Sequence, residues 1–363
     1  MSDPFIAAQR LRRGFTLVEL LVVIAVIALI LMLVIPSIQS PRISAFKNSC
    51  RNNVKQLGLA LLNHQDTYRT FPPLVYSGDS KLKGNLDAQT VEAADLRYSF
   101  NVRLLPFIEE DSLYKQISKA STKFSQDPNS LRVTNSGVSG EVHPGAIRLS
   151  GFICPGFSGE TESGGFAASN YVALAATTEG KLTPQGAFDP DDAKNTQLWN
   201  VEPDGMVIPD RLARGQPMAR MKDGTSKTCV LAESREGVLI GGGAKETSQN
   251  AWYKASQSYV YAFPPSLSPG TNDVGFDARG NFTTSAKTAI NYGPSVQSPG
   301  AVYKSSASPG PAPRNWGPSS DHQGGIVVHA MGDGSVQEIT TDVDPGAYYS
   351  AITVAGGETL TLP

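Results

Sequence analysis

Near the C-terminus, this 363-residue sequence has histidine and carboxylate side chains, which are types that bind metal ions. His322, His329 and Asp333 form one candidate set, which His64 or His143 would complete. Zinc sites usually draw on short-spaced ligand pairs, and none is present here. Side chains alternate across a strand, so in a strand His329 would point away from its immediate neighbours. We therefore expect these residues to stabilise a hairpin by hydrogen bonds, with no metal and no cofactor bound.

Other patterns with ion-binding or catalytic chemistry are equally weak. The acidic run Asp189-Pro190-Asp191-Asp192 is oxygen-rich, as calcium loops are. Its spacing fits no known cage, however, and a solvated turn is the simpler interpretation. The nucleophile motif Gly-x-Ser-x-Gly is absent, and no loop has the pattern that cradles phosphate. The sequence therefore favours a protein that is not an enzyme.

A further carboxylate, Glu19, lies inside the most apolar segment of the chain, and no charged residue follows it before Pro36. A helix from Phe15 to Ile35 rises about 1.5 Å per residue and is therefore long enough to cross a hydrocarbon core of about 30 Å. Arginines precede the segment, which favours a cytoplasmic N-terminus and a C-terminal part outside. A charge in such a helix is costly unless paired, so we expect Glu19 to be functional. Pro36 is expected to kink the helix.

Arg13, Gly14, Phe15 and Glu19 together resemble the cleavage site of type IV prepilins and type II secretion pseudopilins. The resemblance implies that a prepilin peptidase cuts after Gly14 and that the new amino terminus of Phe15 is methylated. It also implies that Glu19 faces the terminal amine of a neighbouring subunit, so that the two charges neutralise each other in an apolar bundle. A plain membrane anchor would explain neither Gly14 nor Glu19, and a secretory signal peptide has a shorter apolar core.

The segment after Pro36 has apolar residues at helical spacing, which predicts a helix over residues 37–66 with one apolar face. This face consists of Ile43, Phe46, Cys50, Val54, Leu57 and Leu61. We expect it to pack on the sheet of a β-rich head that spans residues 67–363. Within the head, the pattern predicts a strand over Ile326–Met331, paired with Val336–Thr340 across a tight turn at Asp333-Gly334.

A second resemblance extends along nearly the whole chain, to the bacterial prepilin-like proteins grouped as domain of unknown function 1559. It includes Phe152–Pro155, Ser169–Val172 and Glu233, and its last segment has a histidine that precedes Asp-Gly at a slightly shorter spacing than here. The residues that match its other motifs are Asn52, Asn53, Asp223, Gly224, Ser226, His322, Gly324, Gly325, Asp333 and Gly334.

The chain has three cysteines, of which Cys50 lies on the apolar face of the predicted helix and Cys154 begins a Cys-Pro turn. A disulfide between them would join that helix to the head across a loop of about a hundred residues, worth roughly 4–5 kcal/mol in the chain-entropy model. The alternative is two buried free thiols. The sequence leaves both open.

Composition limits the classes of function. The net charge of −2 and a pI near 6.1 argue against a nucleic-acid partner.

The expected fold is α+β and pilin-like. It has a long N-terminal helix, membrane-spanning in its first half, that packs on an antiparallel sheet with a large loop-rich head. The expected parts are a leader over residues 1–14, a transmembrane helix over 15–36, the amphipathic helix and the head.

The resemblances imply a structural pilin- or pseudopilin-like subunit of a type II secretion or type IV pilus-like apparatus. Its partners would be prepilin peptidase, other pilin-like subunits in a homo- or hetero-filament, and an inner-membrane secretion platform. It would cross the bacterial cytoplasmic membrane once, with its head in the periplasm or at the cell surface.

A different class of function, a membrane-tethered module that binds a ligand or glycan, remains open because the head is large and contains aromatic residues that could line a pocket. These are Tyr171, Trp199, Trp252, Tyr253, Tyr259, Tyr261 and Trp316.

Overall fold

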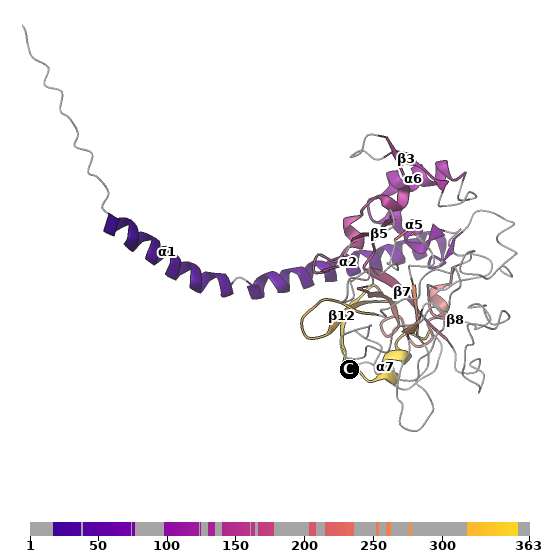
Figure 1. The fold of residues 1–363 in the computed structure, drawn as a ribbon. Coiled ribbons are helices and arrows are strands. Elements are labelled where there is room, and N and C mark those ends of the chain that lie inside the picture. Colours follow the sequence, from indigo (N-terminus) through magenta and orange to yellow (C-terminus); the bar gives the residue numbers. More distant parts are fainter. Residues whose placement is uncertain are drawn as a thin grey trace, which may run out of the picture. The chain divides into compact units, whose positions relative to one another are not determined.

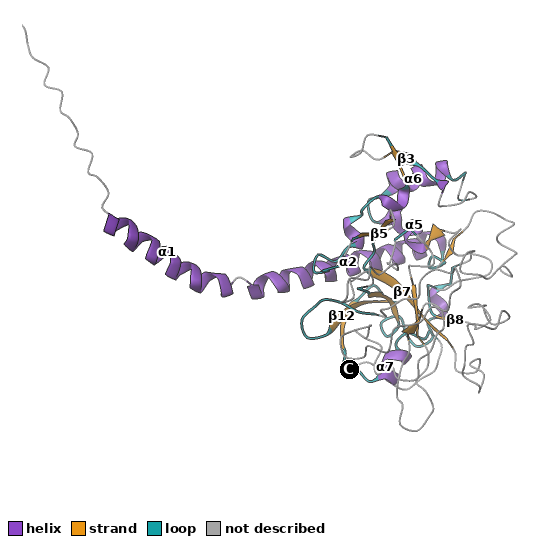
Figure 2. Cartoon of the chain, in the orientation of Figure 1, coloured by secondary structure: helices purple, strands orange, loops and turns teal. Residues whose placement is uncertain are grey.

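The computed structural model describes residues 17–37, 39–73, 75–76, 98–122, 124, 130–134, 140–159, 161–163, 166–177, 203–207, 215–235, 252–253, 259–262, 276–277 and 318–354. The chain divides into two compact units, residues 1–45 and 46–363. Figure 1 follows the elements along the chain, and Figure 2 distinguishes helices from strands.

The first unit contains helix α1 (Leu17–Ser37) and the start of helix α2 (Gln39–Tyr68). α1 ends at Ser37, directly after Pro36, where the sequence predicts a kink. Among the helices that the structure describes, none combines the length and the apolar character needed to cross a membrane. The expected membrane-spanning helix over residues 15–36 is therefore not supported.

In the second unit, α2 buries the face that the sequence predicts. Cys50, Val54, Leu57 and Leu61 are each at most 2% exposed, because their spacing puts them on one side of the helix. The face begins at Cys50 rather than at Ile43, which remains 36% exposed. Beyond Cys50 this buried face shares one apolar core with Val328 and Ala330 of the sheet, and Arg51 and Lys55 are exposed.

The main sheet is mixed, with strand order β11-β10-β7-β9-β12-β13 and β8 paired to β7. All described pairs in it are antiparallel except β10 with β7, which is parallel. The expected antiparallel sheet is therefore present, with this one pair as the exception. Its strands are β7 (Tyr171–Thr177), β8 (Pro203–Asp204), β9 (Cys229–Glu233), β10 (Tyr259–Ala262), β11 (Phe276–Asp277), β12 (Ile326–Met331) and β13 (Val336–Thr340).

The hairpin of β12 and β13 has the bounds that the sequence predicts, with Ile326 opposite Thr340 and Ala330 opposite Val336. Gly334 occupies its turn at φ +75°, a left-handed conformation that favours glycine. A Cβ there would also lie 2.7 Å from Leu62 Cδ1, so glycine lets the turn approach α2. The adjacent Lys55 donates to the carbonyl oxygen of Gly334 at 2.7 Å.

Two apolar cores lie on the two faces of this sheet. One contains the buried face of α2 with Val328 and Ala330, and the other contains Val327, Met331 and Tyr348 from the short helix α7 (Pro345–Ser350). The alternation along β12 follows from the period of two in a strand.

Smaller elements complete the described head. The helices are α5 (Phe100–Leu104) and α6 (Asp111–Ala120), with 3-10 turns at Leu105–Phe107, Pro144–Ala146, Ser150–Phe152 and Met218–Arg220. Three two-stranded pairs are β1 (Val75–Tyr76) with β2 (Tyr98–Ser99), β3 (Val133–Thr134) with β4 (Glu141–Val142), and β5 (Glu162–Ser163) with β6 (Phe166–Ala167).

Candidate functional site, a buried cluster of two cysteines, a glutamate and a histidine

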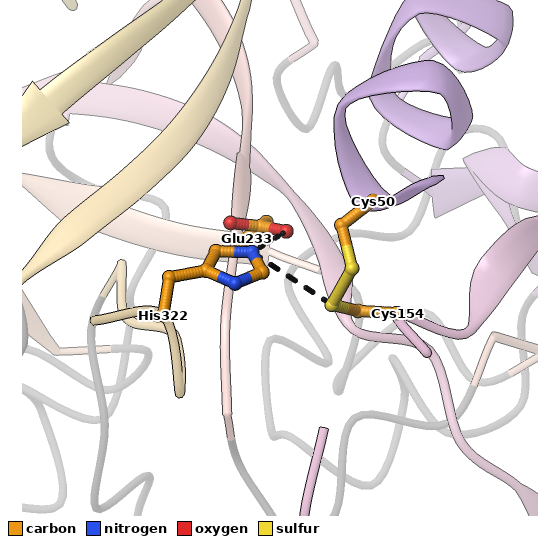
Figure 3. A group of neighbouring side chains, drawn as sticks. All are labelled: Cys50, Cys154, Glu233 and His322. Atoms are coloured by element: carbon orange, nitrogen blue, oxygen red, sulfur yellow. Dashed lines mark hydrogen bonds and ion pairs between the residues drawn. A yellow bond between two sulfur atoms is a disulfide. The ribbon is translucent and has the colours of Figure 1, made fainter. Parts of the chain in front are cut away.

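Four chemically capable side chains meet where α2, the Cys-Pro turn, β9 and the segment before β12 converge (Figure 3). They are Cys50, Cys154, Glu233 and His322, and one ligand atom from each lies within 4.8 Å of the others. All four residues are buried. We call these four residues the buried cluster. It brings together motifs that are far apart in the sequence, which local patterns alone do not predict.

Cys50 and Cys154 form a disulfide with a Cα–Cα distance of 4.8 Å and a sequence separation of 104 residues. The structure therefore has the covalent tie between helix and head, rather than the two free thiols that the sequence also allowed. A loop of about 100 residues is worth about 4.7 kcal/mol in the chain-entropy model. The third cysteine, Cys229, is free and buried.

Glu233 and His322 form a buried hydrogen-bonded pair beside this disulfide. His322 Nε2 lies 3.2 Å from Glu233 Oε1, and the side chains are 4% and 2% exposed. The other carboxylate oxygen, Oε2, accepts from the Val328 amide at 3.0 Å. His322 Nε2 is also 3.9 Å from Cys154 Sγ, so the imidazole faces both the carboxylate and the disulfide (Figure 3).

Burial raises the pKa of Glu233, because a carboxylate removed from water loses its hydration. The hydrogen bonds from His322 and the Val328 amide act in the opposite direction, since they stabilise the charged form. An ionised Glu233 therefore depends on its partners, and removal of either would leave a buried acceptor unsatisfied.

Asparagine side chains hold the backbone around the cluster. Asn170 Oδ1 accepts from the Cys154 backbone amide at 2.9 Å, and the backbone amide of Asn170 donates to Phe152 O at 2.8 Å. From α2, Asn53 Nδ2 donates to Ile153 O at 2.9 Å and to Ser150 O at 3.4 Å. These bonds satisfy backbone groups of a turn that no ladder covers. They position Cys154 for its bond to Cys50.

A small, partly open pocket lies beside the cluster, and its lining includes Cys154, Glu233, Arg235 and Asp321. Arg235 Nη2 and Asp321 Oδ1 form an ion pair at 2.9 Å, with side chains 24% and 13% exposed. Asp321 Oδ2 also accepts from the amide and hydroxyl of Ser158 at 2.9 and 2.8 Å. The residue before His322 thus fastens its segment to the Cys-Pro turn.

The other histidines that the sequence analysis considered in a candidate metal set lie outside the buried cluster. His329 is fully buried on the opposite face of β12, where Nδ1 donates to Val327 O at 3.0 Å and Nε2 accepts from Tyr348 Oη at 2.6 Å. His64 Nδ1 donates to Thr70 O at 2.9 Å, and His143 Nδ1 accepts from the Gly145 amide at 3.0 Å. Burial lowers the pKa of both His64 and His329 to about 4.

Most of the remaining motif residues build two adjoining turns. The Asp333 amide donates to Thr225 O at 3.0 Å, so the turn after β12 packs on the turn at Asp223-Gly224. Asp333 Oδ1 accepts from the Ser335 amide at 2.8 Å, which is turn chemistry rather than metal chemistry. Among the motif residues, the glycines at positive φ are Gly224, Gly324, Gly325 and Gly334. Ser226 and Asn52 are exposed.

The N-terminal residues of interest are only partly described. Glu19 lies in the first turn of α1 and is exposed. Arg13, Gly14 and Phe15 lie outside the described residues, as do Asp189, Asp191 and Asp192.

Sequence reasoning missed that Glu233 is the partner of His322 and that both face the disulfide. Glu233 is the last residue of the buried strand β9, where an ionisable residue is rare unless it is paired. That was the available signal. The link between Asp321 and Arg235 had no comparable signal.

The comparisons with known proteins follow the same motifs. Residues 39–346 match the family model described as protein of unknown function (DUF1559), and residues 9–35 match the prokaryotic N-terminal methylation motif. No curated protein and no solved structure gives a significant match. Because the first of these family models covers most of the chain, the protein belongs to the DUF1559 family and carries a prokaryotic N-terminal methylation motif.

Proposed function

We propose that this protein is a structural pilin- or pseudopilin-like subunit, cut after Gly14 by a prepilin peptidase and methylated at Phe15. The observation that carries the proposal is the N-terminal methylation motif over residues 9–35, which includes Gly14, Phe15 and Glu19. The role is structural rather than enzymatic. The partners are the peptidase, other pilin-like subunits and the inner-membrane platform of a type II secretion or type IV pilus-like system.

The surface of α1 supports assembly. Its large apolar side chains are exposed on every side of the helix, from 47% at Val23 to 77% at Leu17. An apolar surface of this extent needs cover, either from lipid or from helices of other subunits. In a bundle of such helices, the Glu19 carboxylate would meet the amine of a neighbouring Phe15 and fix the axial register.

Residence in the membrane before assembly is part of the proposal, and its support comes from the sequence. The apolar run from Leu20 to Ile35, with the basic residues before it, supports a single-pass protein of the cytoplasmic membrane whose head is exported. The disulfide between Cys50 and Cys154 is consistent with a head in an oxidising compartment.

Ligand binding by the head is not favoured by the described aromatic residues. Tyr171, Trp252 and Tyr253 are at most 1% exposed and belong to the apolar core. Trp199 and Trp316 lie outside the described residues.

Coexpression with a prepilin peptidase tests the proposal. The wild-type chain should lose its leader. Gly14→Glu should retain it, because the backbone at the cleavage site must lie extended and close to the active site of the peptidase, where a side chain would interfere. Glu19→Ala should be processed normally but should fail to crosslink into filaments. A chain that is not cut, or a Glu19→Ala variant that assembles as well as wild type, contradicts the proposal.

A further inference from the structure

The buried cluster offers a complete set of ligands for a metal ion once its disulfide is open. We propose that the reduced chain binds one zinc ion through Cys50, Cys154, Glu233 and His322, so that disulfide and zinc are alternative links between the same elements. Two thiolates, an imidazole and a carboxylate are ligands that zinc uses, in the tetrahedral arrangement of a closed structural site.

The geometry requires only small movements. Metal-to-ligand distances of about 2.0–2.3 Å place tetrahedral donors about 3.3–3.8 Å apart. One ligand atom from each residue already lies within 4.8 Å of the others. Two distances are already close to the required range, 3.2 Å between Glu233 Oε1 and His322 Nε2 and 3.9 Å between Cys154 Sγ and His322 Nε2. Rotation of the freed cysteine side chains would separate the two sulfurs.

The surroundings suit a metal site as well as a disulfide. Glu233 Oε2 is held by the Val328 amide at 3.0 Å, which leaves Oε1 to face the centre of the cluster. The His322 amide donates to Ser320 Oγ at 3.2 Å, and Asn170 Oδ1 accepts from the Cys154 amide. Such outer bonds orient metal ligands and raise affinity. Figure 3 shows the imidazole between the carboxylate of Glu233 and the sulfur of Cys154, with an interaction drawn to each.

The chemistry balances without an unnamed reactant. A phosphine reductant opens the disulfide, giving two thiols and the phosphine oxide, with water supplying the oxygen and the two protons. Zinc then displaces one proton from each thiol and coordinates two thiolates. In the reverse direction, an added protein disulfide accepts two electrons from the thiolates and two protons from the buffer, which converts it to a dithiol. Cys50 and Cys154 form their disulfide again, and zinc is released. Because each sulfur has only one of these two partners at a time, zinc binding opposes oxidation.

Cys229 provides an internal control, because it is buried away from the cluster. It contacts Met331 Sδ at 3.6 Å on the other face of the sheet and lies outside the group of candidate ligands. Zinc binding that depends on Cys229 would therefore point to a different site.

The test uses the full chain in detergent, reduced with a phosphine under anaerobic conditions and titrated with cobalt(II) and then zinc. Reduced wild type should bind one ion, with the thiolate-to-cobalt charge-transfer band of a tetrahedral site. X-ray absorption should find two sulfurs at about 2.3 Å and two lighter atoms at about 2.0–2.2 Å. Zinc should also slow the return of the disulfide when a protein disulfide is added as oxidant.

Variants assign the ligands. Glu233→Gln and His322→Gln should each weaken zinc affinity at least about tenfold, the lower end of what outer bonds alone contribute. Cys229→Ala and Glu338→Gln should bind as wild type does. A cooperative unfolding transition, measured on the oxidised form of each variant, shows that the variant is folded. Equal binding by oxidised and reduced wild type, absence of sulfur around the metal, or normal affinity in both glutamine variants overturns the proposal. So does a reduced chain that unfolds and that zinc does not refold.

Discussion

The Nε2 atom of His322 lies 3.2 Å from the Oε1 atom of Glu233, and neither side chain is more than 4% exposed. Their pairing joins the end of β9 to the segment that precedes β12. A buried pair of this kind is not in itself a large source of stability, because desolvation opposes the attraction. Breaking it is costly, however, because the remaining partner stays buried. The pair therefore makes the local fold depend on both residues.

Glu233→Gln should lower the free energy of unfolding by about 1–3 kcal/mol, the cost of leaving a buried hydrogen-bonding group without its partner. Glu338→Gln is the matched control on the same sheet, where the carboxylate is 25% exposed and pairs with Lys47 at 2.9 Å. An exposed pair is worth at most about 1 kcal/mol. Denaturant unfolding of both variants measures the difference. Equal effects would show that the pair of Glu233 and His322 has no special role.

Alkylation of thiols reports the state of the three cysteines. In the native chain no cysteine should react, because Cys50 and Cys154 are bonded and Cys229 is buried. Burial also raises the pKa of Cys229 to about 12, which leaves almost no reactive thiolate at pH 8. Unfolding without reductant should expose one thiol, and reduction should expose all three, as counted by intact mass. Three reactive thiols without reductant would rule out the disulfide.

Asn53→Ala should destabilise the chain by about 1 kcal/mol, because its side chain donates to Ile153 O at 2.9 Å and to Ser150 O at 3.4 Å. The neighbouring Asn52 is exposed, so Asn52→Ala should change stability by no more than about 0.5 kcal/mol. Thermal unfolding of the two variants compares them directly. The same shift in both would mean that the bonds from Asn53 contribute nothing measurable.

Stability should fall as the pH drops from 6.5 toward 4. Burial lowers the pKa of His329 from 6.5 to about 4, so in this range the unfolded chain takes up a proton that the folded chain does not. The slope is at most about 1.4 kcal/mol per pH unit for one histidine. The raised pKa of Glu233 acts with the opposite sign, since its protonation at low pH favours the fold.

His329→Phe isolates this contribution, because it keeps a ring and removes the titration. The variant should be less stable at neutral pH, where Tyr348 loses its acceptor, but its stability should depend less on pH. The comparison of unfolding free energies at pH 6.5 and 4.5 is the measurement. An unchanged pH dependence would contradict the assignment to His329.

Structural features that depend on neighbouring residues were predictable from the sequence, whereas pairings between distant segments were not. The hairpin of Ile326–Met331 with Val336–Thr340 was predictable, because alternation and an Asp-Gly turn are local. The buried face of α2 was predictable from its period. The parallel pair of β10 and β7 was not, since it joins segments far apart and no local pattern specifies register between them.

The buried cluster was predictable only in part. The sequence grouped His322 with His329 and Asp333 as a candidate metal set but favoured hydrogen bonds that stabilise a hairpin. In the structure His329 lies on the other face of β12, and Asp333 caps a turn. Its actual neighbours come from α2, the Cys-Pro turn and β9. Only tertiary packing brings these elements together, so spacing along the chain carried no information about them.

The central claim is that the chain is matured as a pilin-like subunit, and its new N-terminus tests this most directly. Intact and fragment mass spectrometry should be applied to protein isolated from the cell envelope. The account predicts a chain that begins at Phe15 with one added methyl group on its amine. A chain that still begins before Gly14, or one that begins beyond Pro36, would contradict the account.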